Sequence, residues 1–190
     1  MFRKIETYLV DPSMNCGFSW ISADLAFLVP FLGLTSYAAV TDILGFRIPN
    51  AVSVALVLLF IARYLLVMPP IGLLAHLAVA GSTFVILFAF YLLGWFGAGD
   101  AKLITALMLW AGPEAAPTFI VAMALSGGVF AGLLLLLGKA VQAHPRLAGY
   151  VPSSRVLRWA QRGVCPYGVP IFAAALFVTP LIFNTACNPA

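Results

Sequence analysis

The chain has 190 residues, of which 63% carry hydrophobic side chains and only 8% are charged. Soluble proteins average about 25% charged residues, so the composition excludes an ordinary soluble domain and indicates an integral membrane protein. The formal net charge of +4 is better explained by membrane topology than by nucleic-acid binding, because no aromatic residue beyond Trp159 is interleaved with the basic loop in a pattern typical of nucleic-acid binding.

Apolar segments recur along most of the chain. A helix rises about 1.5 Å per residue and satisfies its own backbone hydrogen bonds, so apolar runs of about 20 residues predict spanning helices. In chain order the expected spans are Leu25–Val40, Ala51–Met68, Ile71–Gly94, Ala101–Gly112, Pro117–Gly138 and Val169–Phe183. The fourth is short for a complete crossing. The sequence predicts an all-α, polytopic membrane helix bundle of about six transmembrane helices.

The polar parts of the chain suggest its organisation and orientation. Residues 1–22 lack the apolar core of a cleavable signal and are expected to form a non-spanning N-terminal segment. Residues 23–190 are expected to form one membrane-embedded domain, with a basic loop at about 139–165. Arg47, Lys102 and this loop fall on one side of a six-span protein, and the positive-inside rule makes that side cytoplasmic.

Two acidic residues, Asp42 and Asp100, lie at the ends of apolar segments. A carboxylate beside hydrocarbon is costly to ionise, so such residues usually serve chemistry, ion passage or internal pairing. Gly97 and Gly99 precede Asp100 and allow the backbone there to unwind or to approach another chain closely. Pro49 favours a helix start, so the first two spans are expected to form a hairpin.

Three motifs resemble those of the type IV prepilin peptidases, membrane aspartic proteases of the Gly-x-Gly-Asp class. They are Asp-x5-Ile-Pro-Asn from Asp42 to Asn50, Gly-Ala-Gly-Asp-Ala-Lys from Gly97 to Lys102, and Pro-Tyr-Gly from Pro166 to Gly168. They occur in order and at the expected ends of the spans. The chain lacks the paired Cys-x-x-Cys motifs of larger members and resembles the short, peptidase-only form of Tad/Flp-type pili, which implies no N-methyltransferase activity.

The resemblance implies an enzyme that removes the short basic leader of a single-span, prepilin-like protein at the cytoplasmic face of the bacterial inner membrane. Asp42 and Asp100 would form a catalytic dyad, in which one carboxylate activates water and the other stays protonated; the sequence leaves open which one holds the proton. The residues expected to bind substrate or shape the site are Gly97, Gly99, Lys102, Arg47, Pro49, Asn50, Tyr167 and Gly168.

Other interpretations of these residues stay open at this stage. Carboxylates beside glycine-broken helices also build ion sites, so a small ion- or proton-coupled transporter is the alternative function, and a non-catalytic scaffold is a third. Taken singly, Asp42 could pair with Arg47 and Asp100 could cap a helix. Lys102 could simply mark the cytoplasmic boundary, and Tyr167 could be an interfacial aromatic residue.

The remaining polar and small residues suggest structural roles. No His, Cys and carboxylate cluster has metal-ligand spacing, so neither a metal nor another cofactor is expected. The expected partners are the substrate and the lipid bilayer, with no nucleic acid; the oligomeric state is left open. Arg63 is expected to reach outward from its helix end, and His76 to pack with a hydrogen bond. Gly127, Gly128 and Gly132 form a small-residue stripe typical of helix packing.

Overall fold

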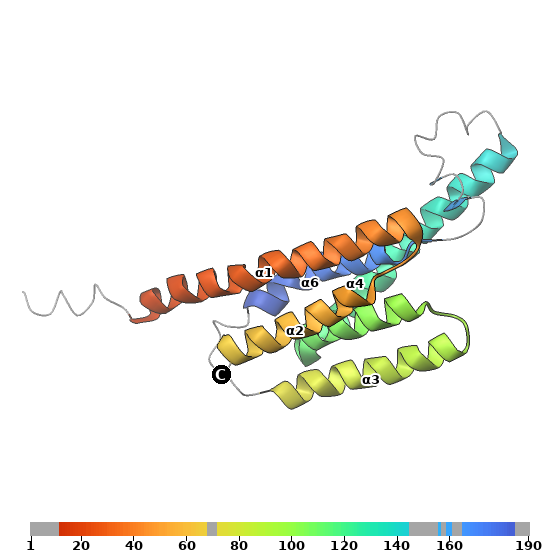
Figure 1. The fold of residues 1–190 in the computed structure, drawn as a ribbon. Helices are drawn as coiled ribbons and strands as arrows, with labels where there is room; N and C mark the ends of the chain where they lie inside the picture. The colour runs from red at the N-terminus through yellow and green to blue at the C-terminus, as the bar shows by residue number, and fades with distance from the viewer. Residues whose placement is uncertain (1–11, 68–71, 145–155, 157–158, 161–164, 185–190) are drawn as a thin grey trace, which may run out of the picture.

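A computed structural model of the chain (Figure 1) describes residues 12–67, 72–144, 156, 159–160 and 165–184. The prediction of an all-helical protein is confirmed, since the described residues form five helices and no strand. The helices are α1 (Pro12–Gly45), α2 (Asn50–Leu66), α3 (Leu73–Leu92), α4 (Ala98–Ala143) and α6 (Gly168–Asn184). Most of the predicted basic loop, and residues 1–11 of the predicted N-terminal segment, lie outside the described residues.

Three helices are long and apolar enough to cross a membrane: Leu25–Gly45 within α1, α3, and α4. Two others, α2 and the Gly168–Phe183 part of α6, are apolar but shorter. The membrane character of the chain is therefore confirmed, whereas the count of about six spans stays a prediction. The predicted limits of the second, third and sixth segments agree with α2, α3 and α6 to within two residues at each end.

The end of α1 and the start of α2 are set by a glycine and a proline in the segment that connects the two helices. α1 ends at Gly45, and the next residue, Phe46, has a left-handed backbone with φ of 51°. Pro49 directly precedes α2 in an extended conformation, with φ of −62° and ψ of 133°. The expected tight hairpin is thus present, because proline fixes φ at a value that suits the start of a helix.

The helix α1 is longer than its predicted segment, and α4 contains two of the predicted segments. α1 begins at Pro12, well before Leu25, because hydropathy marks the lipid-compatible part of a helix and not its first residue. The expected fourth and fifth spans are the two parts of α4, whose backbone is non-helical at Gly112, the residue at which the expected fourth span ends; φ there is 59° and ψ is −170°. In Figure 1 both ends of α4 lie toward the end of the bundle where α3 finishes, so the segments before and after Gly112 run in opposite directions.

The kink in α4 is stabilised by a side chain from α3. Pro113 has no backbone N–H, so it cannot donate the usual helical hydrogen bond to the carbonyl of Leu109. Nδ1 of His76 lies 2.8 Å from that carbonyl oxygen, and Nδ1 must carry the proton because a carbonyl only accepts. The His76 ring covers Gly112 so closely that a Cβ there would overlap it. The expectation that His76 packs with a hydrogen bond is confirmed.

The first segment of α4 forms the centre of the bundle. α4 contacts α2, α3 and α6, while α1 contacts α2 and α6. Trp110 of α4 is 1% exposed, and its indole N–H donates to the carbonyl of Leu56 in α2 at 3.0 Å. Its ring also contacts Phe31 of α1, with ring centroids 4.8 Å apart. Packing on several sides therefore fixes the start of α4, which carries Asp100.

The expectation that Arg63 reaches outward is wrong. Arg63 is only 2% exposed, and its guanidinium donates to the carbonyl of Ile182 in the last turn of α6, at 3.2 Å. The guanidinium also lies over the rings of Phe183 and Trp110, 4.6 and 5.8 Å from their centroids. The last carbonyls of a helix and the faces of aromatic rings both attract a cation. These partners come from other helices, so position along α2 did not reveal them.

The small-residue stripe of α4 packs at one of its three glycines. A Cβ on Gly127 would lie 3.6 Å from Pro170 of α6, and the neighbouring Ser126 hydroxyl is 3.3 Å from the Pro170 carbonyl oxygen. Among the described residues, nothing lies within 4 Å of a Cβ built on Gly128 or Gly132. The packing interpretation therefore holds for Gly127.

Candidate active site

A cleft of about 520 Å³ lies where the α1–α2 connection faces the start of α4. It is lined by two of the three sequence motifs, which packing of α1, α2 and α4 brings together. The lining residues are Asp42, Phe46, Arg47, Ile48, Pro49, Asn50, Gly97, Ala98, Gly99 and Asp100. The cleft thus contains both predicted catalytic residues and five of the eight residues predicted to shape the site.

Asp42 lies in the last turns of α1 and is 6% exposed. Its Oδ2 accepts a hydrogen bond from the backbone N–H of Gly168, at 2.7 Å. A Cβ on Gly168 would lie 2.8 Å from Cβ of Asp42 and 3.3 Å from Cα of Ala39. Only glycine lets α6 approach α1 this closely, so the third motif reaches Asp42 through its backbone.

Asp100 lies in the first turn of α4 and is half-buried. Its carboxyl group folds back over Gly97, where a Cβ would lie 2.9 Å from Oδ2 of Asp100. Asp42 and Asp100 are close enough to interact electrostatically. Within the described part of the chain, no hydrogen bond is made to the Asp100 carboxyl group.

Two contacts hold the motif segments against each other. Nζ of Lys102 donates to Oδ1 of Asn50 at 3.1 Å, which joins the first residue of α2 to α4. A Cβ on Gly99 would lie 3.3 Å from Cβ of Ile48, which is tighter than ordinary packing. Lys102 is exposed and is not among the lining residues, so its observed contact is with the cleft wall.

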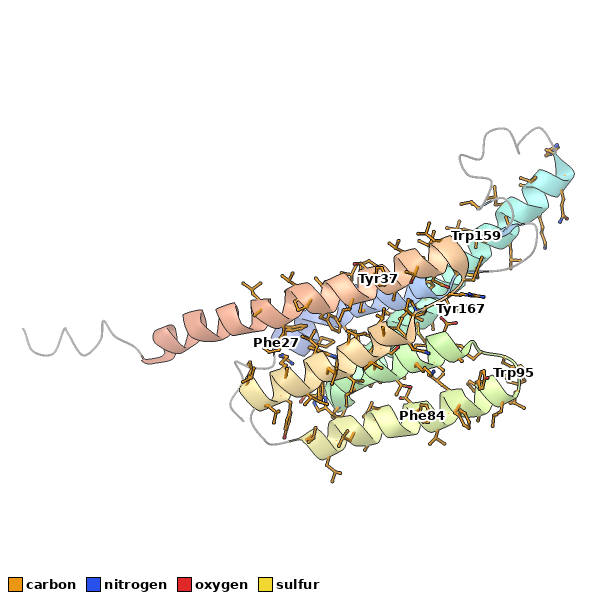
Figure 2. The ribbon with its side chains drawn as sticks, in the orientation of Figure 1. Phe27, Tyr37, Phe84, Trp95, Trp159 and Tyr167 are labelled. Atoms are coloured by element: carbon orange, nitrogen blue, oxygen red, sulfur yellow. The ribbon has the colours of Figure 1, made fainter. Side chains whose placement is uncertain are left out.

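Tyr167 does not line the cleft. Its side chain is 48% exposed, and its ring centroid lies 5.9 Å from that of Phe96. Figure 2 shows Tyr167, Trp159 and Trp95 at one end of the bundle and Phe27 toward the other. Tyr167 is therefore an exposed aromatic residue at the cleft end, while the adjacent Gly168 contacts Asp42.

Three lining residues, Phe46, Ile48 and Ala98, were not among the predicted site residues, although Ile48 and Ala98 are named in the motifs and Phe46 lies within the first motif. Phe46 is the informative one, because it is the only described non-glycine residue with a positive φ. Its ring contacts that of Trp159, with centroids 5.9 Å apart and planes at 82°. Position next to Gly45, at the end of a helix, was the signal that could have found Phe46.

The described residues contain no group of three or more His, Cys, Asp or Glu side chains arranged to hold a metal ion. Cys165 lies close enough to Asp42 to feel its charge. Burial, and then the Asp42 carboxylate, raise the pKa of the Cys165 thiol above its usual range. Because the thiolate is the nucleophilic form, Cys165 is poorly suited to attack a substrate, and the reactive groups that the cleft offers are its two carboxyl groups.

Comparison with known proteins matches residues 28–132 to the type IV leader peptidase family. No curated protein and no solved structure matches the chain. The matched range is more than half of the 190 residues, and it contains both aspartates and both motif segments that form the cleft. The resemblance found in the motifs is confirmed, and the chain belongs to the type IV leader peptidase family.

Proposed function

We propose that the protein is an intramembrane aspartic endopeptidase that removes the short basic leader from type IV prepilin-like proteins. The observation that carries the proposal is the meeting of Asp42, from α1, and Asp100, from α4, in one cleft beside a glycine-rich segment. Two neighbouring carboxyl groups at a water–lipid boundary favour a state in which one is ionised and one protonated. Family membership favours this function over ion transport.

The chemistry follows from such a half-protonated pair. The ionised carboxylate accepts a proton from a water molecule, whose oxygen forms a bond to the scissile carbonyl carbon. The protonated carboxyl group donates a hydrogen bond to the developing oxyanion and later gives its proton to the leaving amine nitrogen. The products are a new carboxyl group and a new amino terminus. The proposal covers cleavage without N-methylation of that terminus.

The side of the membrane on which this takes place is inferred from side chains at the cleft end. Trp95 is 74% exposed and Tyr167 is 48% exposed at that end (Figure 2), and both residue types favour the lipid–water interface. Arg47 and Lys102 lie there too, and basic residues favour the cytoplasmic side. We therefore place the cleft at the cytoplasmic face of a bacterial inner membrane, where the leader of a single-span substrate would meet it.

Cleavage by the purified protein in lipid nanodiscs tests the proposal, with a membrane-anchored substrate carrying a short basic leader and mass spectrometry of the products. Asp42→Asn and Asp100→Asn are each expected to lower turnover by at least about 100-fold, because asparagine keeps the shape and loses the acid–base role. Asp24→Asn, in α1 but outside the cleft, and Glu114→Gln, near the kink of α4, are matched controls and should retain most activity. Robust cleavage by either site variant would remove that residue from the mechanism.

Two further measurements separate the proposal from its alternatives. A proton flux into liposomes that disappears in the Asp42 and Asp100 variants, without any peptide cleavage, would instead support transport. Single cysteines placed at Arg47 and at Glu114 should react with a membrane-impermeant reagent from opposite sides, with position 47 protected in intact cells. Labelling of position 47 from outside would contradict the cytoplasmic placement.

A further inference from the structure

The hydrogen bond from Gly168 distinguishes the two carboxyl groups of the cleft. The backbone N–H of Gly168 can only donate, so Oδ2 of Asp42, at 2.7 Å, must present a lone pair. A bond of this kind is stronger when the acceptor is an ionised carboxylate, and it favours the ionised form. Within the described residues no equivalent donor reaches the carboxyl group of Asp100.

The helix dipoles of α6 and α4 also favour a negative charge on Asp42 and on Asp100. Because both carboxyl groups experience such a dipole, it does not decide which one is ionised. Gly168 is the first residue of the 17-residue helix α6, so Asp42 lies at its positive end. Asp100 lies in the first turn of α4 and experiences a similar field. The direct bond from Gly168 is the difference that remains.

Burial makes Asp42 dependent on this bond. Asp42 is 6% exposed, whereas Asp100 is half-buried. A buried carboxylate without a donor takes up a proton more readily, because burial penalises its charge. Removing the Gly168 N–H would therefore favour the neutral form of Asp42 over its carboxylate.

We propose that Gly168 is a positioning residue whose N–H holds Asp42 in the ionised state, so that Asp42 is the general base and Asp100 the general acid. This inference rests on the proposed peptidase function. The proton of water goes to Asp42, its oxygen bonds to the scissile carbonyl carbon, and the proton of Asp100 goes to the leaving nitrogen. Transfer of the new proton from Asp42 to Asp100 restores the starting state.

The sharpest test replaces one atom of the backbone. Glycolic acid incorporated in place of Gly168 converts the amide N–H into an ester oxygen and adds no Cβ, which matters because a Cβ would collide with Asp42. The full-length protein in nanodiscs is then assayed for kcat/KM across pH on the membrane-anchored substrate. A matched ester at Val169, the next residue of α6, controls for the changed backbone chemistry.

Loss of the N–H is expected to move the acidic limb of the pH profile upward by about 1–2 units. Activity at low pH should fall about 10- to 100-fold, with recovery at higher pH. The Val169 ester should leave the acidic limb where it is in the unmodified protein. If the Gly168 ester protein does not insert, Gly168→Ala and Gly168→Pro are compared with each other. Both add the Cβ that displaces Asp42, and only proline lacks the N–H, so a higher acidic limb in the proline variant than in the alanine variant reports the lost donor.

Three outcomes would overturn the inference. A uniform loss of activity at all pH values would show a structural role only, and an unmoved acidic limb would show that Asp42 does not depend on the amide. A shift of the alkaline limb alone would reverse the two roles. Failure of the peptidase proposal itself looks different, since the unmodified protein would then not cleave the substrate at any pH.

Discussion

Replacement of His76 tests whether the hydrogen bond at the α4 kink stabilises the bundle. In His76→Leu the carbonyl of Leu109 loses its donor, and Pro113 cannot replace it. An unsatisfied buried carbonyl costs about 1–3 kcal/mol. Loss of the contact between the rings of Phe60 and His76, whose centroids are 5.6 Å apart, adds about 0.5–1.5 kcal/mol. We expect the free energy of unfolding to fall by about 3 kcal/mol.

His76→Asn is the matched comparison, because asparagine has nearly the shape of leucine and carries an amide donor. It loses the ring contact and keeps a group that can donate to Leu109, so its loss should be about 1 kcal/mol. Unfolding by SDS in mixed micelles, followed by tryptophan fluorescence, gives the free energies. Leu77→Ala, at an exposed position of α3, controls for general effects on that helix.

The difference in free energy of unfolding between His76→Leu and His76→Asn measures the contribution of the hydrogen bond to the Leu109 carbonyl. Equal stability of the two variants would refute the reasoning, because the carbonyl of Leu109 would then need no donor. A leucine variant as stable as the unmodified protein would also refute the role given to the ring contact.

Three other predictions concern the cleft and the helix ends. Asp42→Asn should lower the pKa of Cys165, because the negative charge of Asp42 raises it. Alkylation of Cys165 at fixed pH, with the other two cysteines replaced by serine, should therefore become faster. An unchanged alkylation rate would contradict the proximity of Asp42 and Cys165. Gly99→Val should reduce turnover at least about tenfold, because its branched side chain must displace Ile48, and Gly99→Ala should reduce it less. Equal turnover by the valine variant and the unmodified protein would exclude a role for this contact. Arg63→Ala should lower the free energy of unfolding by about 3 kcal/mol through the lost hydrogen bond and aromatic contacts. SDS titration measures this free energy, and a loss of less than about 1 kcal/mol would contradict a stabilising role for Arg63.

Apolar run length predicted most of the helices, because a bilayer imposes the same length on every helix that crosses it. Glycine and proline predicted the hairpin between α1 and α2, since their backbone preferences act locally. The start of α1 at Pro12 was not predictable in this way, because a helix can continue beyond lipid without an apolar signal. The break in α4 at Gly112 could be predicted from glycine and proline, but the His76 side chain of α3 that covers it could not, because that contact joins distant parts of the chain.

The candidate site was predictable as a set of residues, but its contacts were not. Motif order indicated that Asp42 and Asp100 belong together, and both line the cleft. The bond between Asp42 and Gly168 joins residues 126 positions apart through a backbone N–H, which has no side-chain signature. Arg63 shows the same limit, since its burial depends on Ile182 and on rings from α4 and α6.

The place of Gly168 in the chain has a consequence for biogenesis. Chains are synthesised from the N-terminus, so α1 and the start of α4 enter the membrane before α6, whose first residue donates to Asp42. A nascent chain that contains both aspartates still lacks this donor until α6 is inserted. On the proposed mechanism, a chain that ends before α6 would lack the donor that keeps Asp42 ionised, so it would need a higher pH for cleavage than a chain in which α6 has joined the bundle.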